Sequence, residues 1–103
     1  MSVRTIDEIL NPWVRHHGLR VSNVYRDQFY YVDIADDVGG RYEISIFKDD
    51  PPDLIKVRVS SNRKRSCGFR GVGPTDLEGV LEQAYSRVIR WVEQAGGTRV
   101  IAS

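Results

Sequence analysis

The side chains best suited to recognition in this sequence are aromatic and basic residues that alternate with apolar ones in the middle of the chain. They are Phe29, Tyr31, Phe47, Lys56 and Arg58. Aromatic rings bury apolar area against a protein partner or stack on nucleic-acid bases, and cations beside them neutralise acidic groups or phosphates. If these residues share one face of a sheet, that face is a candidate binding surface.

A basic run follows shortly afterwards, at Arg63, Lys64 and Arg65. Such a loop can hold phosphates or acidic protein surfaces. It is also expected to emerge at the same end of the sheet as Asp36 and Asp37, so local charge balancing is the competing interpretation.

Residues with catalytic potential are few. Cys67 lies among arginines, a setting that favours a thiolate, but no Cys/His signature surrounds it and His16 and His17 stand at the expected end of a helix. We interpret both histidines as facing water. A cysteine-dependent enzyme is only the third hypothesis, and no catalytic residue, cofactor or small-molecule substrate is predicted.

One acidic pair could attract a metal ion. Asp33 and Glu43 become neighbours in the expected strand pairing, where Arg58 or Arg20 could neutralise them instead. The acidic turns at residues 36–37 and 49–53 lack the alternating ligands of a calcium loop. We therefore predict no metal site.

Length and composition indicate one small folded domain. The chain has 103 residues, 41% of them hydrophobic, and 15 basic against 14 acidic residues, so any nucleic-acid role must depend on a local patch. The expected domain covers residues 1–97, with 98–103 as a tail or an edge strand. A single cysteine, no basic and apolar leader and no bilayer-length apolar run predict a cytoplasmic protein without a membrane partner.

The elements that must position the candidate side chains follow from periodicity. A helix is expected from the capping box of Thr5 and Glu8 to Gly18, with a kink or restart at Pro12. Strands are expected at residues 19–25, 28–35, 41–48 and 54–60, then a loop at 61–73. A second capping box at residues 75–78 should begin a long helix that ends at Gly96.

The turns between the expected strands, at residues 26–27, 36–40 and 49–53, are too short for crossover helices, so the strands should form an antiparallel meander. The predicted fold is α+β: a two-layer sandwich in which both helices pack on one face of a four-stranded sheet. Pairing across the turn at 36–40 puts Val32 opposite Ile44 and Ile44 beside Val59 on the inner face. The outer face then receives rows of three residues: Phe29, Phe47 and Lys56; Tyr31, Ser45 and Arg58; Asp33, Glu43 and Ser60.

This order of elements is similar to that of double-stranded RNA-binding domains. That family places lysines at the start of its last helix, where this chain has Thr75, Asp76 and Glu78. Frataxin-like domains also place a meander between two helices, but their acidic ridge is not reproduced at Asp7 and Glu8. Both likenesses are of topology only, and no family is assigned.

Two functions therefore compete. The first is a small non-enzymatic protein-binding module, of the inhibitor, immunity or adaptor type, whose partner is another protein or a second copy of the chain. The second is single-stranded nucleic-acid binding through the same face and the loop of Arg63, Lys64 and Arg65.

Overall fold

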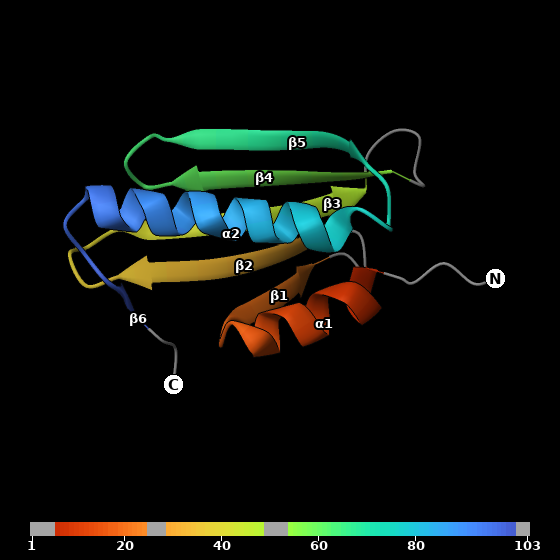
Figure 1. Cartoon of the computed structure of the whole chain (residues 1–103), viewed down its shortest axis with the longest axis horizontal. Helices are drawn as coiled ribbons and strands as arrows, with labels where there is room; N and C mark the ends of the chain where they lie inside the picture. The colour runs from red at the N-terminus through yellow and green to blue at the C-terminus, as the bar shows by residue number, and fades with distance from the viewer. Residues whose placement is uncertain (1–5, 25–28, 49–53, 101–103) are drawn as a thin grey trace.

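In a computed structural model of the chain, two helices lie against one face of an antiparallel sheet (Figure 1). The structure describes residues 6–24, 29–48 and 54–100. The elements are α1 (Ile6–His16), β1 (Arg20–Val24), β2 (Phe29–Asp36), β3 (Arg41–Lys48), β4 (Ile55–Ser61), β5 (Ser66–Val72), α2 (Leu77–Gln94) and β6 (Arg99–Val100). The predicted α+β sandwich with both helices on one face is confirmed.

The sheet is a meander in the order β1-β2-β3-β4-β5, with every neighbouring pair antiparallel. The short strand β6 pairs with β2 through Asp36 and Arg99, beyond Asp33, the last β2 residue that β1 reaches. The expected turns at 26–27 and 49–53 and the tail at 101–103 lie outside the described residues.

The prediction had four strands in the meander, whereas the described residues form five, β1 to β5, besides the short β6, so one strand of the meander was missed. β5 occupies most of the segment that was expected to be a loop. Its Cys67 and Phe69 pair with β4 on the inner face, but a bulge then breaks the alternation before Val72, with Gly71 in the left-handed region at φ 65°. Glycines and the broken period hid the strand, and pairing with β4 overrides its weak propensity.

The predicted register of the central strands is confirmed. Val32 pairs with Ile44, and Ile44 pairs with Val59, so the three strands present one continuous apolar inner face. The turn that fixes this register places Gly39 at φ 85°, which suits a three-residue hairpin loop with a left-handed last residue.

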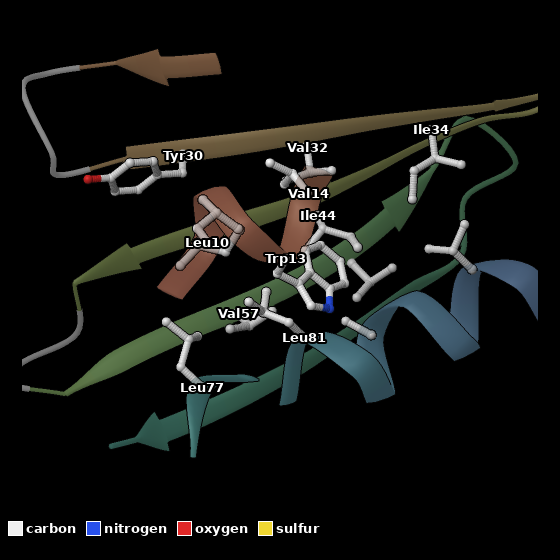
Figure 2. Close-up of a cluster of buried hydrophobic side chains, with 14 of the residues drawn as sticks. Leu10, Trp13, Val14, Tyr30, Val32, Ile34, Ile44, Val57, Leu77 and Leu81 are labelled. Atoms are coloured by element: carbon white, nitrogen blue, oxygen red, sulfur yellow. The ribbon is translucent and has the colours of Figure 1, made fainter. Parts of the chain in front are cut away.

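The core lies between this inner face and the two helices (Figure 2). Leu10 of α1 and Leu81 of α2 are fully buried beside Val32, Ile44 and Val57 of the sheet. Each amphipathic helix buries its apolar stripe in one shared cluster, which is why neither helix is available to cover the other face of the sheet.

The first helix runs without a break through Pro12 and ends at His16, and Gly18 follows it in the left-handed region at φ 63°. The Leu19 N–H donates to Val14 O at 2.8 Å and the Gly18 N–H to Arg15 O at 3.2 Å, which is the Schellman pattern. This ending turns the chain directly into β1. The expected N-terminal cap, Thr5, lies outside the described residues.

The long helix α2 starts later than the capping box predicted. Asp76 is its N-cap residue, its backbone is already helical at φ −98° and ψ −9°, and its side chain makes no capping hydrogen bond. The expected box beginning at Thr75 is therefore not formed. At the other end, Gly97 N–H donates to Val92 O at 3.0 Å and Gly96 N–H to Glu93 O at 3.0 Å, so the predicted glycine stop is confirmed.

Candidate binding surfaces

The outer sheet face carries the predicted aromatic and basic rows. Phe29 pairs with Phe47, and Phe47 pairs with Lys56; in the next row, Tyr31 pairs with Ser45 and Ser45 with Arg58. These five predicted site residues and Ser45 therefore come from three adjacent strands and share one face. Among the described residues, no helix packs on this side, because both helices contribute to the core on the other.

The aromatic rings on this face shield one another. The Phe29 and Phe47 ring centroids lie 5.7 Å apart with a tilt of 31°, and the Lys56 ammonium lies 5.5 Å from the Phe47 centroid. Phe29, Tyr31 and Phe47 are each half-buried. These residues therefore form a packed aromatic patch in which the Lys56 ammonium lies over the Phe47 ring.

The other end of the same face carries both carboxylates and arginines. Asp33 and Glu43 are paired across β2 and β3, as predicted, and Arg20 of β1 lies opposite Asp33. The Ser45 hydroxyl donates to Glu43 Oε1 at 3.0 Å. The outer face thus carries the cations Lys56 and Arg58 toward one end and a mixture of carboxylates and arginines, with Arg20 and Arg41 beside Asp33 and Glu43, toward the other.

The basic loop does not join this face. Arg63 Nη2 donates to the carbonyl of Val38 at 3.0 Å, so this side chain extends to the β2–β3 turn. Arg65 Nη1 donates to Gln94, so the second side chain extends to α2 in the helix layer. Lys56 stands about 16 Å along β4 from Ser61, where the turn begins, at roughly 3.3 Å per residue. The structure therefore separates the predicted site into two groups of residues.

Arg63 also meets the buried carboxylate of Asp36, with Nη1 3.8 Å from Oδ2. That carboxylate has no exposed side-chain surface, and it accepts hydrogen bonds from Gly40 N at 2.6 Å, Val38 N at 3.0 Å and the Tyr42 hydroxyl at 2.9 Å. The positive charge of Arg63 therefore lies beside the negative charge of Asp36, as the charge-balancing interpretation of the basic loop predicted. The network locks the β2–β3 turn to the β4–β5 turn.

The electrostatics of this network follow from burial and hydrogen bonding. Burial alone would raise the pKa of Asp36, but the N–H groups of Gly40 and Val38, the Tyr42 hydroxyl and the charge of Arg63 lower that pKa below its ordinary value of 3.8. The pKa of Tyr42 is raised above 10.0, first by burial and then by the bond to Asp36. Asp36 is therefore an anion and Tyr42 a neutral donor at neutral pH.

A second polar cluster joins the two helices, and sequence reasoning missed it. Glu82 Oε1 accepts from Trp13 Nε1 at 2.7 Å and lies 2.6 Å from His17 Nε2. The His17 ring packs on Tyr85, with centroids 4.3 Å apart, and its side chain is only 15% exposed. The prediction that both histidines face water is therefore wrong for His17 and holds for the exposed His16.

The contacts of Glu82 set its charge state. The hydrogen bond from His17 lowers the pKa of Glu82 below 4.5, and the bond from Trp13 adds to this, whereas partial burial opposes it. The bonds join residues 65 and 69 positions apart in the chain, so no local pattern in the sequence could have shown them.

Arg99 of the C-terminal strand β6 also contacts this polar cluster between the two helices. Arg99 of β6 donates to the Tyr85 hydroxyl at 2.7 Å and to the carbonyls of His17 and Gly18 at the end of α1. Its guanidinium carbon also lies 5.6 Å from the Tyr85 ring centroid. This arginine therefore ties β6 to both helices.

The geometry gives no support for a reactive cysteine or a metal site in the described ranges. Cys67 is a free, half-buried thiol on the inner face of β5. Within the described ranges, no three side chains of the His, Cys, Asp or Glu type gather to hold a metal ion. No helix in the same ranges has the length and apolar character to cross a membrane.

Fold and surfaces together define a two-layer α+β sandwich that presents one face of its sheet. Searches of family models, curated proteins and solved structures find no match to this chain.

Proposed function

We propose that the chain is a small protein-binding module that contacts its partner through the outer sheet face. The observation that carries this proposal is the group of three aromatic side chains, Phe29, Tyr31 and Phe47, on adjacent strands of the face that the helices leave uncovered. A sheet face that only meets water is satisfied by polar residues, whereas clustered aromatic area is characteristic of contact surfaces.

The charges around the patch indicate which chemical groups a partner surface should carry. Lys56 and Arg58 lie on the β4 side of the aromatic rows, and the pair of Asp33 and Glu43 lies farther along the same face. A complementary surface would place acidic groups opposite the two cations and an apolar group over the rings. Such complementarity orients the partner and speeds association more than it adds affinity. A second copy of the chain could supply this surface as well as another protein.

The test is a matched pair of variants in an affinity capture from native extract at high salt after nuclease treatment. Phe47→Asp places a charge in the centre of the patch, whereas Gln83→Asp places it on an exposed site of α2. We expect the first variant to fold and to lose a partner, with a purified complex weakened tenfold or more, as for a central aromatic contact. A folded Phe47→Asp protein that keeps every partner and its own oligomeric state refutes the proposal.

Single-stranded nucleic-acid binding is the second candidate, and the interleaving of Lys56 and Arg58 with the rings is the observation that favours it. The discriminating measurement is the dependence of affinity on salt. If all five cations, the loop at 63–65 included, met phosphates, log K would fall with log salt at a slope of about −3.5, and replacing the loop cations with glutamine would reduce that slope. An apolar protein contact would change little with salt.

A further inference from the structure

A small pocket lies where the β4–β5 turn meets the C-terminal end of α2, the two segments that stand side by side at the left of Figure 1. Its volume is about 150 Å³. The lining combines two guanidinium groups with a hydroxyl, an amide and an apolar floor: Tyr42, Ser61, Arg63, Arg65, Trp91, Gln94 and Ala95. It opens on the helix side of the sheet, so it is distinct from the aromatic outer face.

The backbone of the turn that carries both arginines is fixed. Ser61 N–H donates to Arg65 O at 2.9 Å, and the Ser61 hydroxyl oxygen accepts the N–H groups of Arg63 at 3.2 Å and Arg65 at 3.4 Å. Lys64 adopts φ 64°, the left-handed conformation that closes such a tight turn. Both guanidinium groups therefore start from a preorganised base, which lowers the entropic cost of using them together.

The arginines have more donors than their protein partners use. Arg63 donates to one carbonyl and Arg65 to one side-chain amide, while each guanidinium carries several further N–H groups. Arg63 Nη1 lies 3.8 Å from Asp36 Oδ2, beyond hydrogen-bond distance, whereas the Asp36 oxygens accept hydrogen bonds from Gly40, Val38 and Tyr42. The residues that line the pocket include two arginines and no carboxylate, so the pocket itself is positively charged.

We propose that this pocket binds a small oxyanion group, either a tetrahedral phosphate or sulfate or a carboxylate. Arg63 and Arg65 would donate charge-assisted hydrogen bonds, and the Ser61 hydroxyl, whose oxygen already accepts two N–H groups, would donate its own hydrogen. The ring of Trp91, which lies 6.4 Å from that of Tyr42, forms the apolar floor beneath the anion. The proposal does not depend on the sheet face, and either can fail without the other.

The test is an NMR titration of the full chain with sodium phosphate, sodium sulfate and sodium acetate, each at an ionic strength held constant with sodium chloride. We expect saturable shifts at the Trp91 indole N–H and in residues 61–65, with a dissociation constant of about 1 mM or tighter, roughly −4 kcal/mol. Saturation by phosphate and sulfate alone assigns a tetrahedral ligand. Saturation by acetate as well assigns a site open to carboxylates.

Variants separate a site from diffuse charge screening. Arg65→Gln should weaken phosphate binding at least tenfold, whereas Arg87→Gln, on an exposed position of α2, should leave it unchanged. Arg63→Gln should weaken phosphate binding to the same extent as Arg65→Gln. Because Arg63 also contacts Asp36, its replacement could prevent folding, and in that case the result for Arg65→Gln alone tests the proposal. Shifts that do not saturate, or that Arg65→Gln and Arg87→Gln reduce equally, overturn the proposal.

Discussion

The buried hydrogen bond between Tyr42 and Asp36 offers the sharpest test of how this fold is held together. Its length is 2.9 Å, and both residues are almost fully buried, at 4% and 6% exposure. Tyr42→Phe removes the hydroxyl and leaves the ring in place. Asp36→Asn keeps the shape of the side chain but removes its charge. Together the two variants measure the bond and the charge that strengthens it.

The expected magnitudes follow from the contacts. Tyr42→Phe removes a hydrogen bond to a charged acceptor, which costs about 1.5–3 kcal/mol of unfolding free energy. Asp36→Asn converts three charge-assisted bonds into neutral ones that are about half as strong, and we expect a loss on the order of 2 kcal/mol. In a domain of this size, 2 kcal/mol lowers the melting temperature by roughly 8–16 °C.

The assay is urea unfolding of the wild type, the two single variants and the double variant. Because Tyr42 and Asp36 contact each other, the double variant should lose less than the sum of the singles, by about 1 kcal/mol. If Tyr42→Phe costs less than about 0.5 kcal/mol, or if the two effects add within about 0.3 kcal/mol, the bond does not stabilise the fold as argued.

The same network predicts a pH dependence. The folded-state pKa of Asp36 is lower than 3.8, so at a pH between the two values the unfolded chain binds the proton and the folded chain does not. The stabilisation from this carboxylate is therefore complete above 3.8 and is lost as the pH falls through the folded-state pKa. The difference in stability between the wild type and Asp36→Asn should narrow over that acidic range and stay constant near neutral pH.

Three further outcomes can be checked by thermal or urea unfolding. Gly40→Ala should cost about 3 kcal/mol of unfolding free energy, because its Cβ would lie 2.2 Å from a carboxylate oxygen of Asp36. Gly39→Ala has open space around it and should cost only about 1 kcal/mol, because alanine disfavours the left-handed backbone of this position. Equal losses of stability in the two variants would contradict the steric argument. Glu82→Gln should cost about 1 kcal/mol at neutral pH, and because the pKa of Glu82 is lowered, the difference from wild type should vanish as the pH falls below 4.5 through that pKa. Arg99→Met should cost about 1–2 kcal/mol and speed amide hydrogen exchange at the end of α1; unchanged exchange there would show that Arg99 does not tie β6 to that helix.

Local periodicity was enough to predict the central part of the fold. Alternation of apolar residues in β2, β3 and β4, together with the glycine turn, fixed the pairing of Val32 with Ile44 and of Ile44 with Val59. A shift of one residue would have exposed the whole apolar set, so only one register buries it. The same alternation placed Phe29, Tyr31 and Phe47 on the outer face.

Elsewhere the tertiary structure decided the outcome. β5 is a strand because Cys67 and Phe69 find partners on β4, although its glycines and its bulge give the segment no strand pattern of its own. The pairing of Glu82 with His17 depends on how α1 and α2 pack, and the separation of Arg63 from the aromatic face depends on which side of the sheet its turn leaves. Spacing along the sequence determines which face of an element a residue occupies, but contacts between distant elements depend on packing, which no local pattern encodes.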